Sequence, residues 1–216
     1  MRRLAAAFSY LLHMPYKHVW LILSTARVIC STFRRQSKKK ILRSTAGPSE
    51  TDMQFKVRRA VIGDEPVLRA LRLQALTDSP GAFSSTYERE LARTTEDWRR
   101  WLAGGVTFIL EAGGDPSGLV AGSRDAQGFS AVHLMAMWVH PALRGTGAAH
   151  ALVSSLKAWA AEVGATQVRL KVVETNFRAT RFYERAGFRA TGHKGVLEKS
   201  GAIEMEMTCD VFPCDQ

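Results

Sequence analysis

The 216-residue chain is poor in cysteine and lacks the clustered histidines and cysteines that protein metal sites use. Its three cysteines, Cys30, Cys209 and Cys214, are too few and too scattered for a disulfide framework or a paired metal site. The six histidines are also spread along the sequence without metal-ligand spacing. We therefore expect no bound metal, and the odd number of cysteines favours a reducing, cytoplasmic location.

Acidic residues are absent from the first 49 positions, and the first one is Glu50. The same segment holds enough lysine and arginine to account for the whole formal net charge of +10. The rest of the chain contains equal numbers of bases and acids, so it is electrically neutral. We expect no nucleic-acid partner for that neutral body, because binding to the phosphate backbone requires a basic surface.

A long apolar run is absent as well. Within the first 49 residues the longest uncharged runs, residues 4–16 and 18–26, are separated by Lys17, whereas a membrane-spanning helix needs about 20 apolar residues. We therefore expect no transmembrane span. Residues 1–52 are interpreted as a basic N-terminal extension and linker. Three interpretations of it remain open: a targeting or membrane-surface segment, a nucleic-acid-binding arm, or sequence upstream of a natural start at Met53, which we favour.

Strand-like and helix-like patterns alternate after this extension, which predicts one α/β domain over residues 53–216. The helices are expected at residues 64–76, 94–102, 145–163 and 176–186. The strands are expected at residues 55–61, 106–111, 118–122, 132–139, 167–173, 188–190 and 202–209. Residues 132–139 are almost continuously apolar, which is typical of a central strand buried on both faces.

A glycine-bearing loop follows that central strand and leads into the next helix. The N–H groups in the first turn of a helix have no partner, and the helix dipole makes that end positive. Gly145 and Gly147 leave these N–H groups accessible, and Arg144 adds a positive charge. The loop therefore predicts a phosphate or pyrophosphate site. Its spacing matches neither the dinucleotide-binding fingerprint nor the P-loop.

A second motif lies about thirty residues further on, and with it the sequence resembles the GNAT superfamily of N-acetyltransferases. The family's Arg/Gln-x-x-Gly-x-Gly/Ala loop is matched by Arg144, Gly147 and Ala149. Its later helix motif, Asn-x-x-Ala-x-x-Phe-Tyr-x-x-x-Gly-Phe, is matched by Asn176, Ala179, Phe182, Tyr183, Gly187 and Phe188. The resemblance covers residues 55–210 and leaves the extension outside.

The resemblance implies an α/β fold with a mixed, mostly antiparallel central sheet flanked by helices. In that fold a splayed pair of central strands forms the acyl-CoA cleft. It also implies an acetyl-CoA-dependent N-acetyltransferase, in which a primary amine of a small molecule or a protein attacks the thioester directly. A homodimer is compatible with the family. The alternative is a non-catalytic acyl-CoA-binding module that acts as a sensor or scaffold.

The resemblance also implies roles for particular residues. Tyr183 would protonate the leaving thiolate, since a phenol with a pKa of about 10 lies only about 1.5 pKa units above a thiol. Asn176 would hold the pantetheine arm, which would pair with the strand at residues 137–139. The complete set expected to bind acetyl-CoA is Met137, Trp138, Val139, Arg144, Gly145, Thr146, Gly147, Ala148, Ala149, His150 and Asn176.

No general base is assigned from the sequence. Ribosomal-protein acetyltransferases of this superfamily carry a glutamate at the position of Lys171, and a cationic lysine cannot replace it. Glu174 and His133 remain open as alternatives. Acceptor specificity is expected to come from residues 73–90, where two aromatic residues and two acids would suit a cationic amine or simply form a helix surface. These four are Phe83, Tyr87, Glu88 and Glu90.

Overall fold

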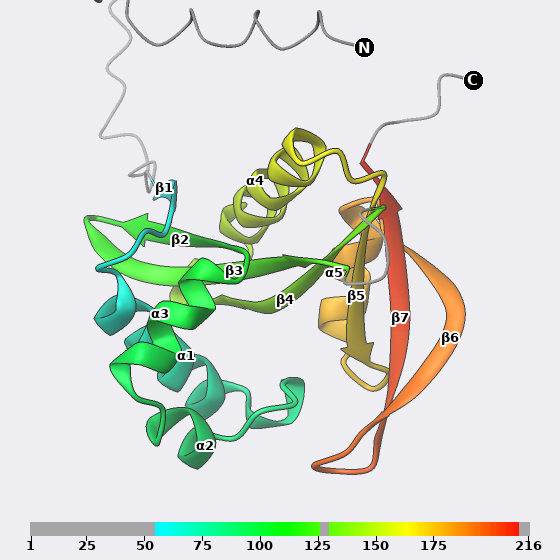
Figure 1. Cartoon of the computed structure of the whole chain (residues 1–216). Helices are drawn as coiled ribbons and strands as arrows, with labels where there is room; N and C mark the ends of the chain where they lie inside the picture. The colour runs from blue at the N-terminus through cyan, green and yellow to red at the C-terminus, as the bar shows by residue number, and fades with distance from the viewer. Residues whose placement is uncertain (1–54, 126–129, 212–216) are drawn as a thin grey trace, which may run out of the picture. The chain divides into compact units, whose positions relative to one another are not determined.

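Seven strands form one sheet in the order β1-β2-β3-β4-β5-β7-β6 (Figure 1). The computed structural model describes residues 55–125 and 130–211. All neighbouring strands are antiparallel except β4 and β5, which run parallel. The strands are β1 (Phe55–Arg59), β2 (Val106–Ala112), β3 (Asp115–Arg124), β4 (Ala131–Val139), β5 (Gln167–Val173), β6 (Arg189–Leu197) and β7 (Ala202–Asp210). The predicted mixed, mostly antiparallel sheet is confirmed.

Helices cover both faces of this sheet. They are α1 (Glu65–Asp78), α2 (Tyr87–Leu91), α3 (Thr95–Ala103), α4 (Ala148–Glu162) and α5 (Phe177–Arg185). Adjacent strand residues point to opposite faces, so Leu110 packs in the core with α4 whereas Ile109 packs in the core with α1 and α3. Figure 1 shows α4 on one side of the sheet and α1, α2 and α3 on the other.

Capping residues explain where several helices begin. Thr94 and Asp97 form a capping box at the start of α3, in which each side chain accepts from the other's backbone N–H. Asn176 caps α5 through its side chain. Asp64 stands at the expected position before α1 but does not cap it, because its carboxylate accepts from Arg58 and from the N–H of Val61 instead.

Four details differ from the sequence-based expectations. Strand β6 continues to Leu197, whereas a strand of only residues 188–190 was expected. Helix α2 was not expected, although Thr86 accepts a hydrogen bond from the N–H of Arg89 at its start. Helix α4 begins at Ala148 rather than residue 145, because the two preceding glycines have positive φ. Strand β4 is not buried on both faces along its length: 40% of Met135 is exposed, at a point beyond the last residue that pairs with β5.

Candidate active site

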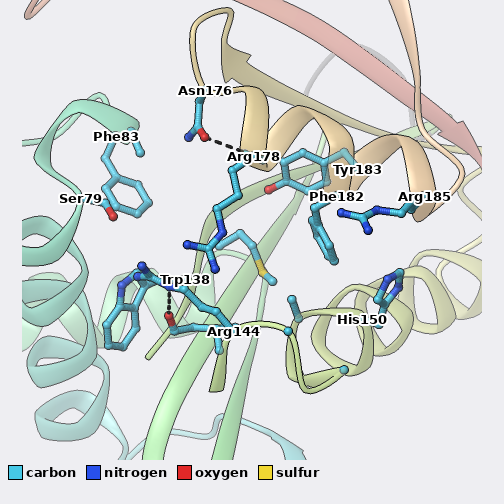
Figure 2. A pocket seen from close by; sticks show the side chains of 17 residues that line it. Ser79, Phe83, Trp138, Arg144, His150, Asn176, Arg178, Phe182, Tyr183 and Arg185 are labelled. Atoms are coloured by element: carbon cyan, nitrogen blue, oxygen red, sulfur yellow. Dashed lines mark hydrogen bonds between the residues drawn. The ribbon is translucent and has the colours of Figure 1, made fainter. Parts of the chain in front are cut away.

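An opening lies where the two parallel strands separate. Pairing between β4 and β5 extends only from Ala131↔Gln167 to His133↔Arg169, although β4 continues to Val139. This divergence opens a cavity of about 530 Å³. Its walls come from the end of β4, the loop before α4, the cleft-facing side of α5 and the segment after α1 (Figure 2). The expected splayed pair of central strands is therefore present.

Strand β4 is irregular beside this cavity. Its register with β3 shifts between Leu119 and Ala121, so an extra residue of β4 is accommodated there. Ala136 lies in this bulge with φ of 55°, a left-handed conformation that costs an alanine about 1–2 kcal/mol. Such bulges redirect a strand's backbone and side chains. The strain is located at the wall of the cavity, where the chain turns from the sheet toward the loop.

The loop between β4 and α4 lines the cavity with Gly145 and Gly147. Gly145 and Gly147 both have φ of 93°, which glycine adopts without the penalty of a side chain. A β-carbon at Gly145 would meet no protein atom within 4 Å. Because the first amides of α4 have no intrahelical partner and carry the positive end of the helix dipole, this cradle suits an anion.

Arg144 does not project freely into the cradle. Its Nε donates to the carbonyl of Val139 at 3.0 Å, and its Nη2 is ion-paired with Asp78 at the end of α1. Asp78 also accepts from Trp138 Nε1 at 3.0 Å and from Ser79 Oγ at 2.7 Å. Partial burial opposes ionisation of Asp78, but the bonds from Trp138, Ser79 and Arg144 outweigh it and lower the pKa of the carboxyl.

Two other arginines, Arg178 and Arg185 of α5, bring positive charge to the cavity. Figure 2 shows Arg178 reaching into the space between Tyr183 and Arg144, and Arg185 lines the same cavity. Among the described residues, Arg178 has no salt bridge. Neither arginine was predicted from the sequence, although their positions four residues before and three residues after Phe182 place all three on one helix face.

Tyr183 is the buried aromatic residue of this wall. Its side chain is in contact with Phe182 and Phe188, at ring-centroid distances of 5.2 and 5.6 Å. Burial raises the pKa of the Tyr183 phenol above its ordinary value near 10, so the hydroxyl keeps its proton at neutral pH. Figure 2 shows its oxygen directed into the cavity. The phenol can therefore donate a hydrogen bond there, but it gives up the proton less readily than an exposed tyrosine.

The side chain of Asn176 can cap α5 with its oxygen and donate to a ligand with its nitrogen. Its Oδ1 accepts from the N–H of Ala179 at 3.2 Å, which starts α5. Its amide nitrogen carries two further donors, and the residue lines the cavity. Capping thus orients the side chain and leaves the amide N–H groups for a ligand.

The structure brings most of the predicted acetyl-CoA-binding residues together. Thr146 and Ala148 are the exceptions, since neither lines the cavity. The N–H and hydroxyl of Thr146 both donate to the carbonyl of Leu143, at 3.3 and 2.8 Å, and Ala148 is fully buried in the core. Those that line the cavity are Met137, Trp138, Val139, Arg144, Gly145, Gly147, Ala149, His150 and Asn176, and the predicted catalytic residue Tyr183 lines it as well.

The cavity lining includes an imidazole, that of His150, to which we assign no role as a base. Among the residues that the structure describes, no aspartate or glutamate lines the cavity. Glu174 is ion-paired with Lys194 at 2.8 Å, and His133 lies 3.9 Å from Asp125, on the part of β4 that still pairs with β5. Of the candidate acceptor residues, Phe83 lines the cavity, whereas Glu90 is buried and ion-paired with Arg72 and Arg93.

Comparison with known proteins places this geometry among acetyltransferases. Residues 73–188 match the model of the Acetyltransferase (GNAT) family. N-acetyltransferases of Mycobacterium tuberculosis and Mycobacterium bovis, both named as uncharacterised, are 44% identical over 61 residues. That match covers 28% of this chain and 39% of each relative.

Solved structures show the same fold. An acetyltransferase of Salmonella typhimurium, solved with acetyl-CoA, has a TM-score of 0.62 at 19% identity and covers 76% of this chain and 97% of its own. A ribosomal-protein-alanine N-acetyltransferase of Brucella melitensis has a TM-score of 0.61 at 22% identity, and covers 72% and 99%. At these identities the likeness is one of fold.

Proposed function

Because the chain belongs to the GNAT family of acetyltransferases, we propose that it transfers an acetyl group from acetyl-CoA to a primary amine of a small molecule or protein. The observation that carries this proposal is the divergence of β4 from β5, with the glycine loop of α4 at one end and Tyr183 on the wall. That arrangement combines an anion site with a buried hydrogen-bond donor in a single cavity. We also propose a reducing, cytoplasmic compartment, in keeping with the free buried thiol of Cys209.

The residues present fit acetyl-CoA. The pyrophosphate would be held by backbone N–H groups between Gly145 and His150, where a β-carbon at Gly145 would occupy empty space. Arg178 would supply a positive charge to the pyrophosphate, because the charge of Arg144 is already paired with Asp78. The pantetheine arm would follow residues 137–139, with the amide of Asn176 as a donor. When bound, acetyl-CoA supplies an activated thioester carbonyl.

Tyr183 provides a hydrogen-bond donor for the leaving group of this reaction. Because its pKa is raised by burial, the phenol stays neutral and can donate to the sulfur of the leaving group. The raised pKa makes complete proton transfer less favourable than from an exposed phenol. We therefore assign Tyr183 to stabilising the departing sulfur through a hydrogen bond. The amine must reach the cavity deprotonated, and we assign no side chain to that step.

Release of free thiol tests the proposal. The full chain, acetyl-CoA and a panel of primary amines are incubated, thiol is measured with a chromogenic disulfide, and the products are weighed by mass spectrometry. We expect amine-dependent thiol release with one acetyl group added per thiol. Saturable binding of acetyl-CoA without thiol release would instead support a non-catalytic sensor or scaffold. Failure to bind acetyl-CoA would contradict both functions.

A further inference from the structure

The segment between α1 and α2, residues 79–86, forms one wall of the cavity, and we call it the strap. Ser79, Ala82 and Phe83 from this segment line the cavity. Figure 2 shows Ser79 and Phe83 on the side opposite Phe182 and Tyr183. The strap therefore faces α5 across the cavity. The distance between the strap and α5 limits the size of the amine that can enter beside acetyl-CoA.

Lys199 ties the strap to a distant part of the chain. It lies in the turn between β6 and β7, and its Nζ donates to the carbonyls of Pro80 at 2.6 Å and Ser85 at 3.1 Å. These two carbonyls flank Ala82 and Phe83. The backbone N–H groups of Ser200 and Gly201 both donate to the carbonyl of Leu197 and close the turn. Lys199 therefore extends to the strap from a hydrogen-bonded turn.

The strap is also held at its beginning. Asp78, the last residue of α1, is bonded to Trp138 of β4 and to Arg144 of the glycine loop. The strap is therefore attached to the β4 side of the cavity through Asp78 and to the β6–β7 turn through Lys199. Loss of the Lys199 contact would leave the first attachment in place and release the second.

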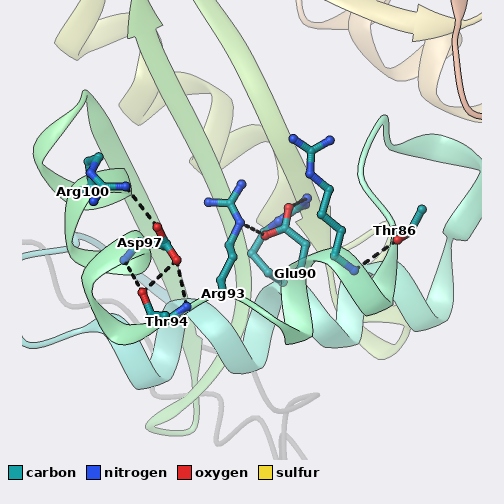
Figure 3. Close-up of polar contacts among 8 residues, drawn as sticks. Thr86, Glu90, Arg93, Thr94, Asp97 and Arg100 are labelled. Carbon is teal, nitrogen blue, oxygen red and sulfur yellow. Dashed lines mark hydrogen bonds and ion pairs between the residues drawn. The ribbon is translucent and has the colours of Figure 1, made fainter.

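A buried ionic cluster supports Phe83 from behind. The guanidinium of Arg72 lies 4.9 Å from the Phe83 ring centre, and only 3% of Arg72 is exposed. Arg72 contacts Glu90 at 3.4 Å, and Glu90 is paired with Arg93 at 2.7 Å (Figure 3). Phe83 therefore packs against a buried guanidinium on one side, while Lys199 bonds the backbone of the strap on either side of it.

We propose that Lys199 is a specificity-determining residue: by clasping Pro80 and Ser85 it sets the position of Phe83 and thereby the size of amine that the cavity admits. The inference rests on the proposed acetyl transfer. Lys199 is not among the described residues that line the cavity, and both of its hydrogen bonds go to the strap, so it acts on the acceptor through the strap. It is a positioning residue, not a catalytic one.

Three variants test this role in the full chain. Lys199→Met keeps the length of the side chain but removes its donors, Lys199→Arg retains donors, and Lys194→Met removes a second lysine of the β6–β7 hairpin that pairs with Glu174. Steady-state kinetics use acetyl-CoA with primary alkylamines and arylalkylamines of increasing size. Amide hydrogen exchange of residues 80–86 is followed in the same variants without substrate.

We expect Lys199→Met to raise kcat/KM for the largest amine relative to the smallest by about three- to tenfold, the effect of losing an exposed charged contact. The KM for acetyl-CoA should change less than about twofold, exchange of residues 80–86 should quicken, and Lys199→Arg should restore most of the selectivity. Lys194→Met should match the wild type in both measurements.

Unchanged amide hydrogen exchange of residues 80–86 in Lys199→Met would contradict the claim that Lys199 holds the strap in place. Faster exchange with unchanged amine selectivity would contradict its role in specificity. In both of these cases the wild-type protein would still transfer acetyl groups, so the proposed function would stand. A wild-type protein that binds acetyl-CoA but acetylates none of the amines would refute the proposed function and the specificity role with it. The two failures are therefore distinguishable.

Discussion

Arg144 and Asp78 form an ion pair that joins the loop before α4 to the last residue of α1. The residue that the motif suggests as a phosphate ligand thus has its charge balanced within the protein. Arg178 is not a position of the family motif, but it lines the cavity and has no salt bridge among the described residues. The two arginines should therefore behave differently when each is removed.

We expect Arg178→Ala to weaken acetyl-CoA binding about five- to tenfold, because it removes a charge that faces the pyrophosphate. The effect should diminish at high salt, since exposed charges are screened. Arg144→Ala should change the Kd less and mainly lower stability. Arg181→Ala, on the same helix but away from the cavity lining, is the matched control. Isothermal titration calorimetry measures the Kd, and a larger loss with Arg144→Ala would contradict this assignment.

Replacement of Gly145 separates backbone strain from ligand binding. Gly145 (φ 93°) and Gly192 (φ 87°) both have left-handed conformations and open space at the β-carbon position. Alanine at either position should cost about 1 kcal/mol of unfolding free energy. Only Gly145→Ala should weaken acetyl-CoA binding, by about tenfold, because the new methyl group enters the anion cradle. Equal Kd values for the two variants would remove the loop from the binding site.

Asn176 allows its cap to be tested apart from its amide donors. Asn176→Asp retains an oxygen that caps α5 and loses the amide N–H groups, so stability should stay within about 0.5 kcal/mol while kcat/KM falls about tenfold. Asn176→Ala should lose both, including about 1 kcal/mol of stability. Urea unfolding and kinetics give the two readouts. Full activity in Asn176→Asp would show that the side chain serves the helix alone.

Tyr183→Phe should lower kcat about 100-fold and leave the Kd for acetyl-CoA within about twofold, because the ring still packs against Phe182 and Phe188. Since burial raises the pKa of this phenol, activity should show no loss from its ionisation up to about pH 10. An unchanged kcat in Tyr183→Phe would exclude Tyr183 from the reaction.

Asp64 predicts a pH dependence of stability. Hydrogen bonds from Arg58 lower the pKa of the Asp64 carboxyl in the folded chain. Its contribution is therefore present above the unfolded pKa of about 3.9 and is lost as the pH falls through the lower folded value. Asp64→Asn should be less stable than the wild type by about 1 kcal/mol at neutral pH, where solvent screens part of the interaction. A difference that persists in strong acid would contradict this origin.

Much of the fold was predictable from local patterns. The apolar segments at residues 106–111 and 167–173 correspond to β2 and β5, and Thr94 and Asn176 stand at the starts of helices as their cap positions predict. Such features depend on neighbours within a few positions in the chain. Helix α2 was missed because its five residues carry too little periodicity to distinguish a helix from a loop.

The sequence by itself determined the loop glycines, the caps and the alternation of strands and helices, because each follows from the conformational preferences of a short stretch of chain. Only the tertiary structure decided which charges are free. Asp78 and Arg144 are 66 positions apart, and Lys199 is 119 positions from Pro80. Which donor meets which acceptor across such distances depends on how the helices pack on the sheet, and side-chain electrostatics act through space rather than along the chain.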